Sequence, residues 1–252
     1  MKKSRLLLAL FLVAALHAGA TTVVPIDVAR QVDQAELIFI GTVIGTESVP
    51  VKDQTFAFTY VTFAVEETLK GAADGPTFTL RTAGGKIPSR RVEVGISGAP
   101  QFETGGRHLL FVMGNDRWGM PYSGGPQGKL DLVRDAVTQE EILTDDAGRV
   151  IDGLRDLNWI RGGLWIDRGG QLRRPERVAE VVSQEGVTVV LDQPDPAAEA
   201  VPASKVLAEL RALIRERSFA PEFKRTAVVK SASPANVPAT DPDRLAARAE
   251  AQ

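Results

Sequence analysis

His108 is one of two histidines in the 252-residue chain, and the other, His17, lies in a segment that we expect to be removed. A single imidazole can act as a general base, but a catalytic triad or a multi-histidine metal site needs further partners. The chain has no cysteine, which excludes thiolate zinc sites, iron–sulfur clusters and thiol catalysis. We therefore expect a structural or solvated His108, and we predict no catalytic residue, no metal ligand and no cofactor.

Two glycine-rich segments approach known catalytic motifs without matching them. To form a phosphate-binding loop around residues 124–129 (GGPQGK), the chain would need Gly at position 123 and Ser or Thr at position 130. Those positions hold Ser123 and Leu130 instead. Residues 95–99 (GISGA) lack the closing Gly of a hydrolase nucleophile elbow. We predict a turn that leads into a strand at the first segment and place Ser97 in a loop.

Carboxylates occur in three adjacent pairs, at Glu66–Glu67, Glu140–Glu141 and Asp145–Asp146. Neighbours along a strand point to opposite faces, so such a pair does not converge on one substrate atom. The spacing around residue 145 does not match a calcium loop, and we expect a solvated hairpin turn there. A hydrolase that uses only carboxylates would need two of them to meet from separate elements, and we keep that alternative.

Basic and aromatic residues suggest a contact surface. Positive charge gathers over residues 81–91, which suits an acidic glycan or an acidic protein partner. Trp118 and Tyr122 follow in a Gly- and Pro-rich stretch. There they either contact a partner or pack over the end of a barrel. The binding residues that we predict are Arg90, Arg91, Trp118 and Tyr122.

Residues 1–20 have the layout of a secretory signal peptide. A basic start precedes an apolar run at 6–16, and Ala18 and Ala20 supply small residues at the positions that a signal peptidase reads. The run is shorter than the about 20 residues that a membrane span needs. We predict cleavage after Ala20 and export of residues 21–252, to the periplasm or the medium of a bacterium, with no membrane span. A retained N-terminal anchor is the alternative.

The composition is that of an ordinary globular protein, with 44% hydrophobic and 25% charged residues. Removal of the signal peptide takes three positive charges and leaves a net charge of −5. No overall basic field would attract nucleic acid or anionic lipid. A mature chain of this length buries a core without the disulfides that export would permit.

The first half of the mature chain predicts short strands separated by Gly turns. A helix is expected at 27–35, a strand that is apolar on both faces at 37–44, and a long alternating strand at 56–68. Further strands are expected at 77–82, 91–96, 107–113 and 128–133. This pattern predicts a mainly β fold, α+β overall, with a closed antiparallel barrel or a sandwich in the first half. Of the two we predict that residues 21–135 form a small antiparallel OB-type barrel.

The second half predicts an appended α/β segment at 136–225. A strand at 140–144 and a turn at 145–148 suggest a hairpin. A short helix is expected at 176–184, and a longer C-terminal helix with one apolar stripe begins near Ser204. Residues 226–252 have little to bury, and we predict a disordered tail.

The order of these elements resembles a known module. The segments AELIFIGTVIGTES (35–48), FAFTYVTFAVEETLKGAADGPTFTLRTAGG (56–85) and FETGGRHLLFV (102–112) resemble the netrin-like module, the OB-type barrel of the tissue inhibitors of metalloproteinases. They also resemble uncharacterised exported bacterial proteins with the same layout. The inhibitors place an N-terminal cysteine on the protease zinc, whereas this mature chain would begin at Thr21 and has no cysteine. The inhibitory mechanism is therefore not carried over.

Three functions follow from these observations. The leading hypothesis is an exported, non-enzymatic binding or structural protein whose partner is a protein or a glycan at the cell surface. The second is an inhibitor of an extracellular protease that acts through residues 21–25 and the loops near 84–90. The third is the carboxylate-based hydrolase.

Overall fold

The computed structural model describes residues 26–51, 55–96, 98–115, 120–135, 138–167, 172–173, 200–225 and 228–234. The expected signal peptide, the helix expected at 176–184 and Trp118 lie outside the described residues. Within these ranges, no helix has the length and apolar character needed to cross a membrane.

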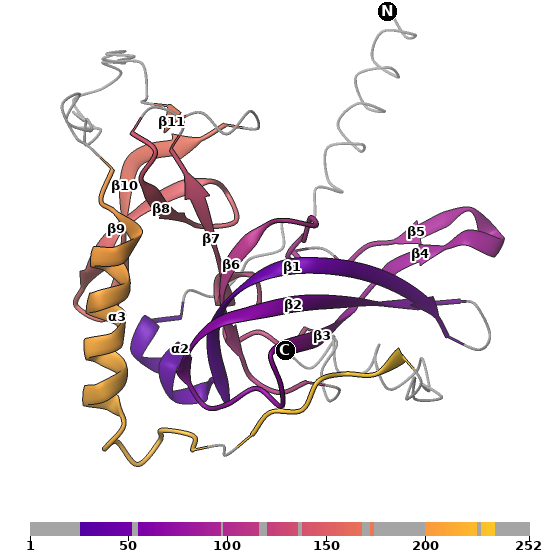
Figure 1. The fold of residues 1–252 in the computed structure, drawn as a ribbon, viewed down its shortest axis with the longest axis horizontal. Coiled ribbons are helices and arrows are strands. Elements are labelled where there is room, and N and C mark those ends of the chain that lie inside the picture. Colours follow the sequence, from indigo (N-terminus) through magenta and orange to yellow (C-terminus); the bar gives the residue numbers. More distant parts are fainter. Residues whose placement is uncertain are drawn as a thin grey trace, which may run out of the picture.

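Strands dominate the described chain (Figure 1). They are β1 (Leu37–Pro50), β2 (Ala57–Lys70), β3 (Thr77–Ala83), β4 (Gly85–Ile87), β5 (Val92–Val94), β6 (Arg107–Val112), β7 (Lys129–Arg134), β8 (Glu141–Thr144), β9 (Arg149–Arg155), β10 (Asn158–Ile166) and β11 (Leu172–Arg173). The α-helices are α2 (Val28–Gln34) and α3 (Ala203–Arg217), and single 3₁₀ turns occur at η2 (Pro88–Arg90) and η3 (Gly125–Gly128).

Nine strands form one antiparallel sheet in the order β11-β10-β9-β8-β7-β6-β1-β2-β3, and β4 pairs with β5 in a separate hairpin. The prediction of a mainly β, antiparallel fold is confirmed. The predicted closed OB-type barrel is not, because β3 and β11 end the sheet at opposite edges. After β6 the chain adds strands outward instead of returning to β3. The sheet therefore runs on past residue 135, where we expected the barrel to end.

Strand β1 is buried on both faces over its first half, as its sequence predicts. Ile38 and Ile40 pack into the core beneath the helices. Leu37 and Phe39 point the other way, into a second core that contains Phe63. The alternation of side chains thus places β1 between two hydrophobic layers.

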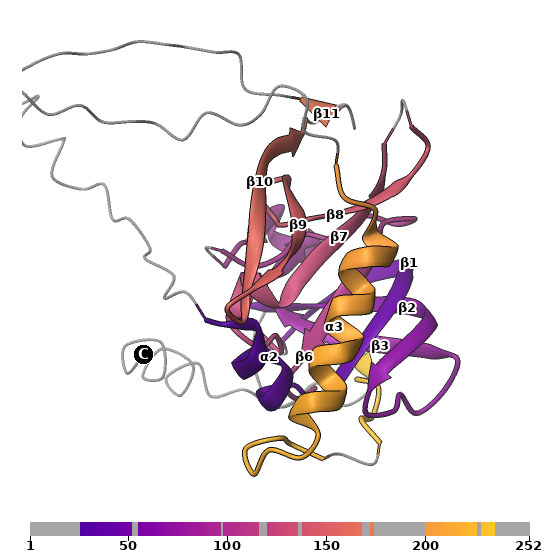
Figure 2. The same cartoon turned by 90° about the vertical axis from the view of Figure 1, so that its left-hand side faces the viewer.

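The helices cover one face of the sheet, and Figure 2 shows α3 lying across it. Helix α2 begins after the predicted cap Asp27, whose carboxylate accepts a 2.6 Å hydrogen bond from the Arg30 backbone N–H. Helix α3 buries the apolar stripe that the sequence predicts, in the same core as α2 and strands from both halves of the chain. This shared core joins the two halves.

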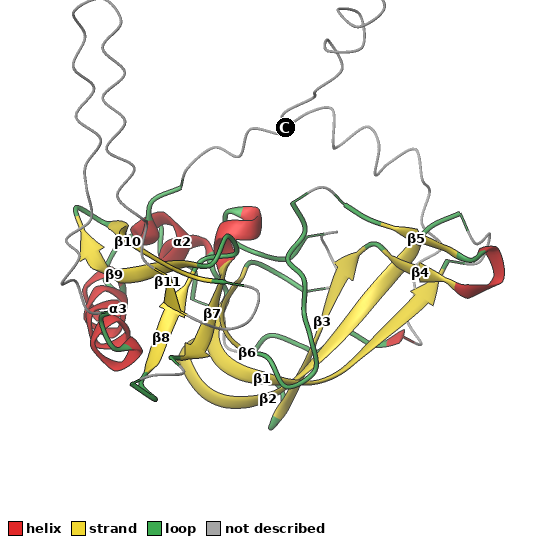
Figure 3. Cartoon of the chain, turned by 90° about the horizontal axis from the view of Figure 1, so that it is seen from above, coloured by secondary structure: helices red, strands yellow, loops and turns green. Residues whose placement is uncertain are grey.

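Strands β1 and β2 curve over their 14-residue lengths, as seen from above in Figure 3. Their pairing shifts register at three places, the last of them between Val43 and Gly45. Extra residues of this kind bend a strand and increase its twist. The β4–β5 hairpin projects at the end of the molecule away from α3 (Figure 1).

Residues 228–234 are an exception to the tail expected from residue 226. Val229 and Ala232 are buried, and the Ala232 N–H donates to the Thr79 carbonyl oxygen in β3 at 2.8 Å. Asp74 accepts hydrogen bonds from the backbone and the hydroxyl of Ser231. Small side chains let this short stretch lie close against the edge of the sheet, which local composition did not indicate.

Candidate functional site

A cavity of about 600 Å³ lies between the far ends of β1, β2 and β3, the β4–β5 hairpin and the loop at 99–102. We call it the hairpin cavity. Its floor follows from strand register, because Thr46 pairs with Val61, while Thr59 pairs with Ser48 on one side and Thr82 on the other. Paired residues on antiparallel strands point to the same face. Four hydroxyl groups therefore share the floor with one valine.

The hairpin is fixed at its base by the floor. The Thr59 hydroxyl donates a 2.9 Å hydrogen bond to the carbonyl oxygen of Gly84. The next residue, Gly85, has φ of +144°, and a Cβ on it would lie 2.6 Å from Thr59 Oγ1 and 2.9 Å from Ser48 Oγ. Only glycine fits this conformation and this close approach. Gly84 and Gly85 thus carry the backbone directly over the sheet, and Gly85 starts β4.

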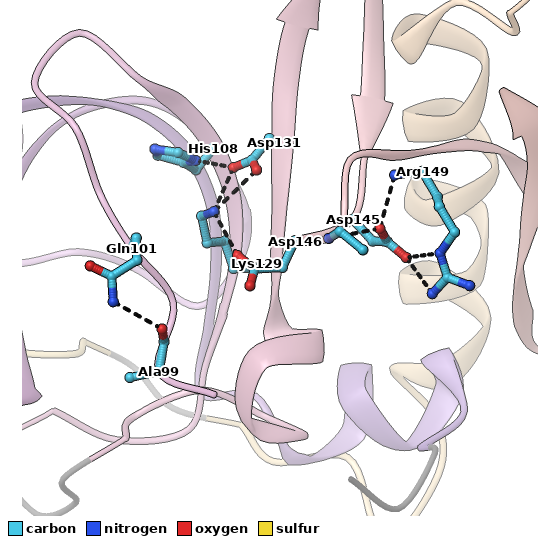
Figure 4. A network of polar contacts seen from close by, with 9 residues as sticks. Ala99, Gln101, His108, Lys129, Asp131, Asp145, Asp146 and Arg149 are labelled. Carbon is cyan, nitrogen blue, oxygen red and sulfur yellow. Dashed lines mark hydrogen bonds and ion pairs between the residues drawn. The ribbon is translucent and has the colours of Figure 1, made fainter. Parts of the chain in front are cut away.

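Phe102 forms the inner wall and connects the cavity to a buried polar group. Its ring meets the His108 imidazole edge to face, with 5.2 Å between the ring centres, and it stacks on the Tyr122 ring with 6.2 Å between the centres. Beside it, the Gln101 side-chain amide donates to the Ala99 carbonyl oxygen at 3.3 Å (Figure 4). Aromatic packing therefore sets the position of this wall.

Behind Phe102, four polar side chains form the network shown in Figure 4. His108 and Asp131 are direct partners on β6 and β7, and their Nδ1 and Oδ1 atoms are 2.6 Å apart. Lys129, only 4% exposed, places Nζ 2.9 Å from Asp131 and 3.1 Å from Asp146. The register of neighbouring strands and the turn after β8 assemble the network.

The protonation state of this network limits its chemistry. Burial raises the pKa of Asp131, but the His108 hydrogen bond and the Lys129 charge outweigh burial, so the pKa lies below its usual range. An ionised Asp131 can only accept, so His108 Nδ1 is the donor. His108 Nε2 has no hydrogen-bond partner among the described residues, and a Cβ on Gly106 would lie 2.8 Å from it. The backbone of Gly106 therefore covers the nitrogen that would exchange a proton with a substrate.

The first carboxylate pair diverges, as the sequence predicts. Glu66 binds Arg107 at 2.6 Å, whereas Glu67 forms a two-point ion pair with Arg211 of α3 at 2.7 and 2.9 Å. The pairing of β1 with β2 shifts register at this point, between Ile40 and Gly41, so strict alternation between the faces does not separate the two contacts. Both carboxylates connect structural elements.

The turn at residues 145–148 is also held by its own charges. Asp145 accepts hydrogen bonds from the Ala147 and Arg149 backbone N–H groups and pairs with the side chains of Arg149 and Arg161. A hollow of about 490 Å³ beside it is lined by these residues and by Lys129. Across the described part of the chain, no three His, Cys, Asp or Glu side chains are placed to hold a metal ion. Residues 125–128 form η3 before β7, which is the turn-then-strand arrangement that we predicted.

The structure separates the predicted binding residues. Arg90 and Arg91 are exposed at the tip of the hairpin, in the turn whose Pro88 lines the cavity. Tyr122 is 1% exposed and supports Phe102, so it does not form a contact surface of its own. Arg81 leaves the basic cluster, because its guanidinium lies buried, 4.7 Å from the centre of the Phe58 ring. Trp118 lies outside the described residues.

Sequence reasoning missed the floor of the cavity. Thr59 and Thr82 fall on predicted strands, but Thr46 and Ser48 lie past the strand expected at 37–44, because β1 continues to Pro50 where we expected a polar loop from Ser48. Their convergence depends on register. Comparisons of the chain with protein-family models, with curated proteins and with solved structures found no match. The geometry of the cavity therefore carries the functional conclusion.

Proposed function

We propose that this protein is an exported, non-enzymatic binding protein that holds its ligand in the hairpin cavity. The observation that carries the proposal is the cavity itself. Its volume of about 600 Å³ lies within the range of ligand sites, and its floor consists of regular strands. Hydroxyl groups and a few apolar side chains, among them Val61 and Phe102, give it the mixed lining of a recognition site.

The arrangement of ionisable groups supports binding over catalysis. Nε2 of His108 is covered by Gly106, and Lys129 is shared by two carboxylates. A general acid or base must reach the substrate proton within hydrogen-bond distance. None of these groups lines the hairpin cavity. Two carboxylates do line the cavity, Glu47 of β1 and Glu93 of β5, and Glu93 faces Lys86 across the hairpin. The carboxylate-based hydrolase therefore stays an alternative.

Export is supported by the layout of residues 1–20, with small residues at positions 18 and 20. The resemblance of residues 35–112 to the netrin-like module is part of this proposal. One observation favours the rival function, inhibition of an extracellular protease. The exposed hairpin tip, including Arg90 and Arg91, projects as an inhibitory loop would. Titration of purified metalloproteases and serine proteases with the protein separates the two, because a pure binding protein leaves their activity unchanged.

The test of the proposed function uses two probe collections, a glycan array and a phage-displayed library of random twelve-residue peptides. Thr46→Trp fills the cavity from its floor, and Thr68→Trp adds the same ring at an exposed position of β2 outside the cavity. We expect at least one class of probe to bind the wild-type protein and the Thr68→Trp variant but not Thr46→Trp. Circular dichroism and thermal melting show that both variants are folded. Probes that bind all three proteins equally, or no probe from either collection, would contradict the proposal.

A further inference from the structure

The hairpin cavity reaches an edge of β1 that has no partner strand. Strand β6 pairs with β1 only from Leu37 to Thr42, and Gly105 and Gly106 then form hydrogen bonds with Val43. Over residues 44–50, the only backbone partner of β1 within the described ranges is β2. Seven residues of strand edge, roughly 23 Å long at 3.3 Å per residue, therefore lack a second backbone partner among the described residues.

The lining of the cavity shows that this edge faces into it. Thr46, Glu47 and Ser48 all line the cavity although they are consecutive. The side chains of Thr46 and Ser48 share the floor, and Glu47 between them belongs to the lining as well, so this stretch of β1 borders the cavity. The open backbone is therefore part of the site.

Pro50 indicates which amide groups point to the open edge. It belongs to β1 and pairs with Ala57 of β2, yet it has no N–H to donate. Proline in a sheet turns its nitrogen away from the partner strand. The pairing is regular from Gly45 onward, so alternation places the N–H groups of Thr46 and Ser48 on the same open side.

The charge of the opposite wall adds a second requirement. The hairpin segment 85–96 contains three basic residues and one acidic residue. Lys86 faces Glu93 across the hairpin, and Glu47 of β1 adds a second carboxylate to the lining of the cavity. The excess of positive charge therefore lies outside the cavity, at the exposed tip with Arg90 and Arg91. A ligand that runs along β1 beside this wall gains from negative charge at the flank near the tip.

We infer that the hairpin cavity binds an extended polypeptide segment, with acidic residues at one flank, by adding it as a strand to the open edge of β1. This inference rests on the proposed function and names its ligand class. Main-chain hydrogen bonds supply affinity in this mode of recognition, and alternate side chains of the ligand enter the pocket. Here the floor hydroxyls and Phe102 receive those side chains.

The experiment selects peptides from the same phage library on the whole protein and measures synthetic copies by calorimetry. Thr46→Pro removes one open-edge N–H without removing a bond to β2, and Thr46→Ala keeps that N–H. We expect the proline variant to bind the selected peptide at least about tenfold more weakly than the alanine variant. Circular dichroism confirms that both are folded.

Two further measurements sharpen the test. N-methylation of the peptide at one set of alternate residues should abolish binding, while methylation of the other set is tolerated, because only alternate amides face β1. Arg91→Glu should weaken binding roughly threefold or more at low salt, and the same change at exposed Arg155, which lies on β9 away from the cavity, should not.

The outcomes separate the inference from the function on which it rests. A peptide could fail to bind the Thr46→Trp variant and yet bind Thr46→Pro and Thr46→Ala with equal affinity. That result would overturn strand addition and leave the cavity as the ligand site. Binding by glycans alone would overturn the ligand class in the same way. Peptides that tolerate Thr46→Trp would overturn both.

Discussion

The hydroxyl of Thr59 donates a 2.9 Å hydrogen bond to the carbonyl oxygen of Gly84, and this contact joins the projecting hairpin to the sheet. It sets the height of the β4–β5 wall above the floor. The neighbouring Gly85 passes within contact distance of the same hydroxyl. The cavity therefore depends on two adjacent glycines, Gly84 and Gly85, which also belong to its lining.

Replacement of Gly85 by alanine should disturb the hairpin. The new Cβ would lie 2.6 Å from Thr59 Oγ1, at a φ of +144° that side chains avoid. We expect a loss of about 1–3 kcal/mol in the free energy of unfolding, measured by urea denaturation. Gly95→Ala is the matched control, because a Cβ there meets nothing within 4 Å. Equal stability of the two variants would show that the hairpin base is not held as described.

Asp131→Asn should destabilise the network behind Phe102. The substitution leaves buried Lys129 with only Asp146 as a carboxylate partner, and we expect a loss of about 1–3 kcal/mol at pH 7. Asp146→Asn, at a more exposed carboxylate, should cost less than about 1 kcal/mol. The pKa of Asp131 is lowered in the folded state, so its contribution is complete above the unfolded value and disappears as pH falls through the folded value. A loss that persists undiminished at pH 2 would argue against this assignment.

Lys70 should make stability increase at alkaline pH. Its Nζ donates to the Val32 carbonyl oxygen at 2.5 Å, and burial lowers its pKa to about 8, against the attraction of Asp33. From about pH 8 to 10.5 the unfolded chain binds a proton that the folded chain has lost, so the free energy of unfolding rises. Compared with Lys70→Met, the wild-type protein should gain on the order of 2 kcal/mol over that window in urea titrations. A difference that is constant or falls with pH would refute the assignment.

Leu210→Ala should destabilise both halves of the chain together. Leu210 lies on α3 and is fully buried against strands that precede residue 135 in the sequence and strands that follow it. Its truncation should lower the free energy of unfolding by about 2–5 kcal/mol. Glu216→Ala on the exposed face of α3 serves as the control. Fluorescence of buried Trp159 and far-ultraviolet circular dichroism should report one common midpoint. Two separated transitions would mean that the halves fold independently.

The local sequence pattern was sufficient to predict β2 and the first half of β1. The alternation from Phe56 to Thr68 became β2, and the doubly apolar start of β1 became a strand between two cores. Strand β10 was missed because Gly162 and Gly163 interrupt its pattern. The closed barrel was wrong for another reason. Closure depends on which distant strands pair, and the outward path from β6 has no local signature.

None of the predicted binding residues that the structure describes lines the cavity. Arg90 and Arg91 lie at the exposed tip of the hairpin that forms its wall, and their binding role stays a prediction. Tyr122 was misjudged because a Gly- and Pro-rich neighbourhood suggested exposure, whereas Phe102 covers its ring. The cavity itself arises because β1 extends beyond the end of β6, which is a difference in strand length and not a motif.

Hydrogen–deuterium exchange of the wild-type protein, with and without a saturating peptide selected from the library, tests the central claim most directly. We predict that the peptide slows exchange in residues 44–50 of β1 and in the hairpin, and that the turn at 145–148 is unaffected. Protection confined to the hollow beside Asp145 and Arg149, or to the surface of α3, would contradict the assignment of the hairpin cavity as the binding site.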